Sequence, residues 1–192
     1  MLDFLKEYIK HPRTVGAVAP SGKGLSRKMM EPLDFEHAKV IVEYGPGTGS
    51  FTELLFMKKK PETRLILIEQ NDTFFEQMRE RFDGHAHTTV LHGSAEQADT
   101  LCAYLGIKSA DYVVSGLPFT SLPADTSYRI FKATRHLIGR KGRFVTFQYS
   151  KVKKPFFERY FDFADILFEL RNLPPAYVFV MKNRFKEKRE NT

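Results

Sequence analysis

The segment from residue 39 to residue 60 constrains the fold of this chain more than any other. It begins with the apolar run KVIVEY at 39–44 and continues through the turn GPGTG, which carries three glycines. A segment with Phe51, Leu54 and Leu55 at helical spacing follows the turn. A strand, a glycine-rich turn and a helix in this order predict a βαβ unit. Glycines let a ligand lie directly against the backbone of such a turn, where a side chain would collide with it.

Strand-like and helix-like segments alternate along most of the remaining chain. Further strands are expected at 64–69, 88–92, 111–115 and 143–149, with helices near 71–82, 95–105 and 127–138. This alternation predicts right-handed crossovers and a mainly parallel sheet that is covered on both faces. The last two strand-like runs, 166–171 and 177–182, are joined by the short turn NLPPA and predict an antiparallel hairpin. We therefore expect an α/β protein with a mainly parallel, seven-stranded sheet.

The first 31 residues are expected to form helices that precede this core. Residues 2–10 place apolar side chains on one broad face of a helix, and Ser21 is a candidate N-cap for a second helix to about residue 30. The length of 192 residues and the hydrophobic content of 42% suit one compact domain. We interpret residues 1–192 as a single domain, with an N-terminal helix and lid at 1–31 and the core at 38–192.

The charge of the chain favours contact with polyanions. Lys and Arg number 30 against 23 acidic residues, which gives a formal net charge of +7. Either nucleic acid or an anionic membrane surface would suit such a charge. The N-terminus lacks the apolar region of a signal peptide, and no apolar run approaches the roughly 20 residues that span a bilayer. We expect a cytoplasmic protein.

Metal and disulfide chemistry find no support in the sequence. Cys102 is the only cysteine, so it cannot form an intramolecular disulfide. His85, His87 and His92 lie close together in the sequence, but no acidic residue with ligand spacing accompanies them. We expect no metal site.

The glycine turn can be compared with three known patterns. A dinucleotide fingerprint requires a third glycine where Ser50 stands, and the Gly-Lys-Ser/Thr of a P-loop is absent. The pattern E-x-G-x-G-x-G at 43–49 resembles motif I of class I S-adenosylmethionine-dependent methyltransferases, which have a Rossmann-like fold. The resemblance implies that Glu43 lies under the methionine part of this cofactor and that Gly45, Gly47 and Gly49 border its nucleoside. The alternative is a turn with a purely structural role.

The ends of the second and third strands supply further candidates for the cofactor site. Glu69 ends the second strand, where a carboxylate can accept both hydroxyl protons of a ribose, and Gln70 is expected to support it. Related methyltransferases bind the adenine ring at the end of the third strand. Ser94, Ala95 and Glu96 match by position, although Ser94 would also serve as a helix cap.

The fourth strand runs into the candidate methyl-acceptor segment Ser115, Gly116, Leu117, Pro118 and Phe119. In V-V-x-x-L-P this segment resembles adenine N6-methyltransferases, including rRNA adenine dimethylases. Those enzymes carry Asn at the position of Gly116 and usually Tyr at that of Phe119, so the grip for a weakly nucleophilic exocyclic amine is incomplete here. An aliphatic amine has a localised lone pair once it is deprotonated, and mainly needs alignment with the methyl donor.

Four segments taken together resemble bacterial phospholipid N-methyltransferases, which convert phosphatidylethanolamine stepwise to phosphatidylcholine. They are VGAVAPSG at 15–22, EYGPGTG at 43–49, VVSGLP at 113–118 and NLPPA at 172–176. The resemblance implies that Ser21 and Gly22 lie beside the methionine end of the cofactor. Tyr149 is a candidate for the acceptor pocket, where its ring could contact a methylated ammonium; core packing is the other interpretation.

The resemblance to this family implies that the protein attaches to the inner face of the membrane. Lys6, Lys10 and Arg13 flank the apolar face of the first helix, as in interfacial helices. Further basic residues that would attract an anionic surface are Lys151, Lys153, Lys154, Arg184, Lys186, Lys188 and Arg189. The first helix could instead pack on its own core. Methylation of rRNA adenine, with RNA as the partner, and a non-catalytic cofactor- or membrane-binding module remain the alternatives.

Overall fold

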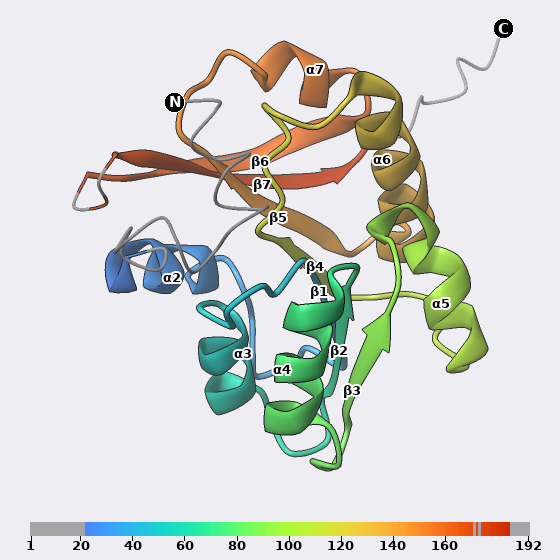
Figure 1. Cartoon of the computed structure of the whole chain (residues 1–192). Coiled ribbons are helices and arrows are strands. Elements are labelled where there is room, and N and C mark those ends of the chain that lie inside the picture. Colours follow the sequence, from blue (N-terminus) through green and yellow to red (C-terminus); the bar gives the residue numbers. More distant parts are fainter. Residues whose placement is uncertain (1–21, 171, 173, 185–192) are drawn as a thin grey trace, which may run out of the picture.

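A seven-stranded sheet forms the centre of the molecule in the computed structural model, which describes residues 22–170, 172 and 174–184 (Figure 1). Its strand order is β3-β2-β1-β4-β5-β7-β6. The parallel strands are β1 (Val40–Tyr44), β2 (Arg64–Glu69), β3 (Thr88–His92), β4 (Tyr112–Ser115) and β5 (Arg143–Gln148). The strands β6 (Phe161–Glu169) and β7 (Ala176–Asn183) are antiparallel. The expected α/β fold with a C-terminal antiparallel hairpin is confirmed.

Helices cover both faces of the sheet. One face packs against α2 (Lys23–Met30), α3 (Thr52–Lys58) and α4 (Asp72–Phe82). The other face packs against α5 (Ala98–Tyr104), α6 (Ala124–Ile138) and the short α7 (Lys154–Glu158). Successive side chains of a strand point to opposite faces, so Leu65 and Leu67 of β2 enter one core while Ile66 and Ile68 enter the other. Burial on both faces explains why β2 is an unbroken apolar run.

The arrangement of the strands defines the edge at which a ligand binds. β1 lies between β2 and β4: the chain runs outward from β1 through β2 to β3 and then crosses back to β4 on the other side of β1. Ligands of open α/β sheets bind at such a switch point, beyond the carboxyl ends of the strands. The turn between β6 and β7 lies at the same edge, because Gln148 at the end of β5 pairs with Tyr177 near the start of β7. We call this side of the sheet the catalytic edge.

Several expected boundaries differ from those observed. The N-cap of α2 is Gly22 and makes no side-chain cap, so the expected cap at Ser21 is wrong; Ser21 and the expected helix at 2–10 lie outside the described residues. β6 begins at Phe161, five residues before the predicted start at residue 166. An irregularity between Phe163 and Asp165 interrupts the alternating pattern on which the prediction depended. The segment expected as one helix at 95–105 opens with a 3-10 turn, η1 (Ala95–Gln97).

Candidate active site

The glycine turn follows β1 at the catalytic edge. Gly45, Gly47 and Gly49 all have positive φ, at 61°, 54° and 90°, a conformation that residues with a side chain rarely adopt. A Cβ on Gly45 would lie only 2.7 Å from Cδ2 of Leu117. The amide of Gly45 donates to the carbonyl of Ile68 on the neighbouring strand at 2.9 Å. The turn is therefore fixed against the neighbouring strand, and its glycines place no side chain between the backbone and a ligand.

Glu43 is a buried acid with an unfilled hydrogen-bonding position. Its side chain is fully inaccessible, and its Oε2 accepts a hydrogen bond of 2.8 Å from the hydroxyl of Thr52. Among the residues that the structure describes, none forms a hydrogen bond with its Oε1. Burial raises the pKa of the Glu43 carboxyl from 4.5 to about 8, opposed by the Thr52 hydrogen bond and assisted by the charge of Glu69. A cationic group beside Oε1 would supply the missing partner and restore the ionised form.

Glu69 lies across the glycine turn from Glu43 and is oriented by two backbone amides. The Gly47 amide donates to its Oε2 at 3.0 Å, and the Asn71 amide donates to its Oε1 at 2.9 Å. Each oxygen keeps a second lone pair for a further donor. Gln70 is exposed, and its carbonyl oxygen lies 3.2 Å from Nε2 of His92. The structure thus fixes the Glu69 carboxylate beside the glycine turn, whereas the Gln70 side chain shows no such fixation.

Three further cofactor candidates follow β3, with Ser94 at the N-cap of η1 and Ala95 and Glu96 within it. The Ser94 hydroxyl accepts a hydrogen bond of 3.2 Å from the Glu96 amide, so Ser94 caps this turn. Ala95 is buried in the core. The carboxylate of Glu96 pairs with Arg129 of α6, which joins this turn to the helix. Capping and ion pairing therefore account for Ser94 and Glu96 in structural terms as well.

The segment after β4 packs directly on the glycine turn. The Gly116 amide donates to the Tyr44 carbonyl at 3.2 Å, and the Leu117 amide donates to the Ser115 hydroxyl at 3.2 Å. A Cβ on Gly116 would lie 3.4 Å from the carbonyl oxygen of Gly45 and 3.5 Å from the ring of Phe51. The structure thus brings the candidate cofactor and acceptor segments together.

Phe119 and Tyr149 occupy different surroundings. Phe119 is fully buried, with ring centroids 5.0–6.0 Å from those of Phe131, Phe144 and Phe157, so core packing accounts for its aromatic ring. Tyr149 is partly buried and packs on Phe147, at 5.4 Å between ring centroids. Phe147 in turn contacts Phe51, which follows the glycine turn. Tyr149 therefore lies on the side of the sheet that α2 and α3 cover.

Two polar residues near the catalytic edge were not predicted from the sequence. Gln148, the last residue of β5, is 2% exposed, and its Nε2 has no hydrogen-bond partner within the described part of the chain. Asn172 accepts a hydrogen bond of 3.0 Å from the Gly22 amide through its Oδ1, and so ties the start of α2 to the β6–β7 turn. A glutamine that ends an otherwise apolar strand is the signal that could have identified the first of them.

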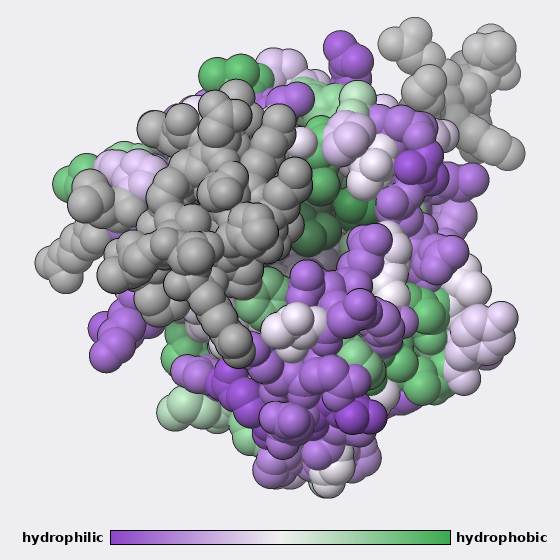
Figure 2. All heavy atoms as spheres, viewed as in Figure 1, coloured by the Kyte–Doolittle hydropathy of each residue, from purple (hydrophilic) through white to green (hydrophobic). Residues whose placement is uncertain are grey.

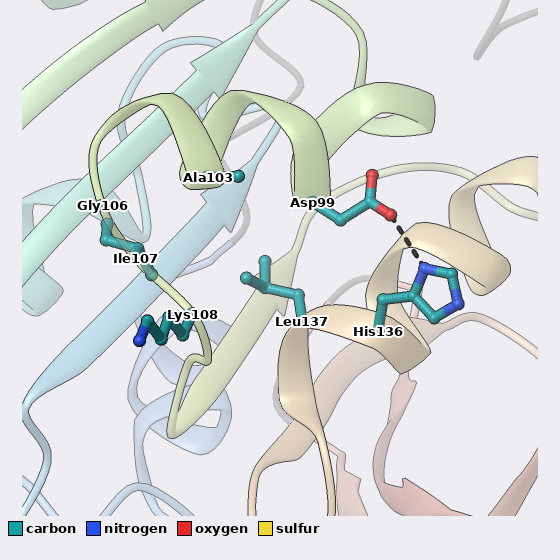
Figure 3. Close-up of a pocket in the computed structure, with 7 residues that line it drawn as sticks. All are labelled: Asp99, Ala103, Gly106, Ile107, Lys108, His136 and Leu137. Carbon is teal, nitrogen blue, oxygen red and sulfur yellow. Dashed lines mark hydrogen bonds and ion pairs between the residues drawn. The ribbon is translucent and has the colours of Figure 1, made fainter.

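A cavity of about 350 Å³ lies elsewhere, between α5 and α6 (Figure 3). Asp99 and His136 form an ion pair of 3.0 Å at its side, and Leu137 lines its wall. None of the predicted site residues lines it, and Ile107 and Lys108 place it before the start of β4. This cavity is therefore remote from the catalytic edge.

Residues 22–170, 172 and 174–184 contain no group of three or more His, Cys, Asp or Glu side chains that could hold a metal ion. Of the helices that the structure describes, none combines the length and the apolar character needed to cross a bilayer.

Comparison with known proteins gives relatives in sequence and neighbours in fold. An ornithine lipid N-methyltransferase of Singulisphaera acidiphila is 35% identical over 175 residues, which cover 90% of this chain and 91% of that protein. Ribosomal RNA small subunit methyltransferase A of a Hydrogenobaculum species is 29% identical over 111 residues, or 58% of this chain and 40% of that protein. No protein-family model matches the chain.

A similar fold occurs in the crystal structure of the 1,6-didemethyltoxoflavin-N1-methyltransferase of Burkholderia thailandensis, which contains S-adenosylhomocysteine. The TM-score is 0.67 at 12% identity, over 95% of this chain and 86% of that one. With the glycine turn after β1, the acid at the end of β2 and the lipid N-methyltransferase relative, this fold defines a class I S-adenosylmethionine-dependent methyltransferase. S-adenosylmethionine is its cofactor. Within that class, the chain belongs to the family of the ornithine lipid N-methyltransferase.

Proposed function

We propose that the protein is an N-methyltransferase that acts on a primary amine in the headgroup of a membrane lipid. The observation that carries this proposal is Gly116, which stands at the catalytic edge where adenine-methylating relatives carry an Asn side chain. A Cβ there would be in ordinary van der Waals contact with the Gly45 carbonyl oxygen at 3.4 Å, and Gly116 itself offers no side-chain oxygen to hold an exocyclic amine. The relative that matches nearly the whole chain is named for N-methylation of a lipid.

The cofactor would be held by residues of the glycine turn and its flanking acids. The unpartnered Oε1 of Glu43 suits the ammonium group of a methionine moiety, and the oriented Glu69 carboxylate suits the two ribose hydroxyls. The positive-φ backbone at Gly45 and Gly47 allows the ligand to approach closely. When bound, S-adenosylmethionine supplies an electrophilic methyl group on its sulfonium.

The acceptor would be positioned by the segment after β4. The hydroxyl of Thr146 donates to the Ser115 carbonyl at 3.1 Å, and the Ser115 hydroxyl in turn holds the Leu117 amide. These contacts fix the backbone from residue 115 to residue 117 against the glycine turn. A rigid backbone at this point aligns a flexible aliphatic amine, whose deprotonated lone pair is already localised for attack.

Phosphatidylethanolamine and ornithine lipid are the two candidate substrates. The short sequence motifs favour the first, and the relative of 35% identity is named for the second. Both present a primary amine at the end of a flexible headgroup, so the proposed site chemistry is the same. We propose that the enzyme acts as a peripheral protein at an anionic membrane surface, consistent with the charge of +7.

The test is a competition between acceptors. The full chain is incubated with methyl-labelled S-adenosylmethionine and either vesicles of phosphatidylethanolamine, vesicles of ornithine lipid, or unmethylated small-subunit rRNA. We expect label in one of the two lipids and none in the RNA. The Gly45→Ala variant serves as the control for label that enters without the enzyme. Label in the RNA alone would contradict the proposal and support adenine methylation instead; cofactor binding without transfer to any acceptor would support a non-catalytic module.

A further inference from the structure

Exposed apolar side chains gather beside the catalytic edge. Val152, in the loop after β5, is 80% exposed, and Phe168 and Leu170, at the end of β6, are 47% and 70% exposed. Phe168 lies near the end of the β6 ladder and Leu170 follows directly after the strand, so both side chains lie at this end of the hairpin. Large apolar groups exposed in this way on a charged protein mark an interaction surface more often than chance placement.

Contacts between aromatic and basic side chains join these residues into one surface. The ring of Phe168 lies against that of Tyr177, with 4.8 Å between centroids. Nζ of Lys151 lies 4.6 Å from the centre of the Tyr177 ring. Lys151 precedes Val152 directly, so the loop after β5 and the β6–β7 hairpin meet here. We call Lys151, Val152, Phe168, Leu170 and Tyr177 the hairpin surface.

The hairpin surface lies at the end of the sheet where methyl transfer takes place. Tyr177 pairs with Gln148, which lies two residues beyond Thr146, the partner of Ser115 at the end of β4. The hairpin extends well beyond the body of the molecule next to α2 (Figure 1). Hydrophobic side chains are visible at the end of this projecting arm (Figure 2). A layer that received these side chains would therefore face the catalytic edge.

The charge around the hairpin surface complements an anionic partner. Neither Lys151 nor Lys153 forms an ion pair within the described part of the chain, and Lys151 is exposed. The acid of the same strand end, Glu169, points to the other face, where its carboxyl carbon is 3.3 Å from the Cβ position of Gly24. Free lysines beside exposed Phe and Leu side chains are the combination that binds the phosphate and acyl layers of a membrane.

We propose that the hairpin surface inserts into the headgroup region of an anionic phospholipid bilayer. Phe168, Leu170 and Val152 enter the acyl boundary, while Lys151 and Lys153 contact lipid phosphates. This docking holds the catalytic edge at the level of headgroup amines. The role of this surface in methyl transfer rests on the proposed function. Membrane binding through it can be measured without any methyl transfer.

The experiment measures binding of the full chain to vesicles of phosphatidylcholine and phosphatidylglycerol, which offer no primary amine. A Phe168→Glu/Leu170→Glu variant is compared with a Met57→Glu/Tyr104→Glu variant, whose original side chains are 78% and 85% exposed away from the hairpin. Each acidic replacement on the hairpin should weaken partitioning by about tenfold, because a large apolar side chain then stays in water. The control variant should bind as the unmodified protein does. A Lys151→Gln/Lys153→Gln variant should lose most of the dependence on phosphatidylglycerol.

Equal binding by the hairpin and control variants would overturn the proposal. A second outcome would also overturn it: the unmodified protein forms a dimer, and the hairpin variant loses this dimer but still binds vesicles. The hairpin surface would then be covered by a second copy of the chain. Activity separates this proposal from the proposed function. The hairpin variant should methylate water-soluble glycerophosphoethanolamine at the normal rate but lose transfer to the same headgroup in vesicles. If vesicle binding depends on the hairpin but no amine is methylated, only the proposed function is refuted. If the hairpin variant methylates the headgroup in vesicles at the normal rate, only the proposed membrane surface is refuted.

Discussion

Replacing Glu43 with Gln tests two effects of one buried carboxyl. The carboxyl lowers the free energy of unfolding of the cofactor-free protein, and it raises the affinity for the cofactor. The substitution keeps the size of the side chain and an acceptor for the Thr52 hydroxyl. It removes the ability to ionise. Because the carboxyl is fully buried with Oε1 unpartnered, the two effects have opposite signs.

The stability effect follows from the raised pKa of Glu43. Folding moves this pKa from 4.5 to about 8, so between these values the folded chain retains a proton that the unfolded chain has released. Stability therefore falls as the pH rises through this window, by about 1.4 kcal/mol per pH unit at most. Between pH 5 and pH 7 the loss is roughly 2–3 kcal/mol. The Glu43→Gln variant lacks this loss. Between pH 5 and pH 7 its free energy of unfolding should therefore rise relative to that of the unmodified protein by the same amount.

The binding effect runs in the other direction. The ionised carboxylate paired with an ammonium group forms a charge-assisted hydrogen bond, worth about 1.5–3 kcal/mol. Its removal should weaken binding of S-adenosylhomocysteine by about 10- to 100-fold. Below pH 8 the unmodified protein should also release protons on binding, since Glu43 becomes ionised as its partner arrives.

Urea unfolding at pH 5 and pH 7, with calorimetric titration of S-adenosylhomocysteine in two buffers, measures both effects. Glu62→Gln replaces an exposed acid and serves as the matched control, for which we expect neither change. If the unmodified protein and the Glu43→Gln variant lose stability equally between the two pH values, the reasoning about burial is refuted. Unchanged affinity would refute the assignment to the ammonium group.

Three further substitutions test the remaining parts of the site. Gly45→Ala should abolish cofactor binding in calorimetry, because φ is +61° and the new Cβ would lie 2.7 Å from Leu117, whereas Gly84→Ala, at φ +85° with open space around it, should bind normally; equal affinities would contradict this. Glu69→Gln should weaken binding of S-adenosylhomocysteine about tenfold, and far less for an analogue without the ribose 2′-hydroxyl; equal losses would place the ribose elsewhere. Gly116→Asn should slow methylation of glycerophosphoethanolamine without creating activity on rRNA, since its amide would extend beyond a Cβ that already contacts the Gly45 carbonyl oxygen at 3.4 Å; a faster reaction would contradict this expectation.

The succession of strands and helices along the chain and the position of the glycine turn could be predicted from the sequence because each depends on a local pattern. Buried parallel strands such as β2 are continuous apolar runs, and the helix after it is marked by Asn71, whose side chain accepts from the Phe74 amide. The glycines at 45, 47 and 49 were informative for the same reason, since their positive φ is a property of the backbone itself.

Features that depend on contacts between distant segments could not be predicted in this way. The start of β6 was missed because an irregularity at Phe163/Asp165 breaks the alternation, and α7 was missed because its five residues are too few for a helical period. The burial of Gln148 and the ring contact between Phe168 and Tyr177 were missed because burial and cross-strand pairing arise only from the tertiary fold.

The most direct test of the account is the identity of the atom that receives the methyl group. Vesicles that contain phosphatidylethanolamine and ornithine lipid are incubated with the enzyme and S-adenosylmethionine, and the lipids are fragmented in a mass spectrometer. We predict a headgroup fragment heavier by one methylene unit, with the added carbon on the amine nitrogen and the acyl chains unchanged. Methylation of a carboxyl or hydroxyl oxygen, or of neither lipid, would contradict the account.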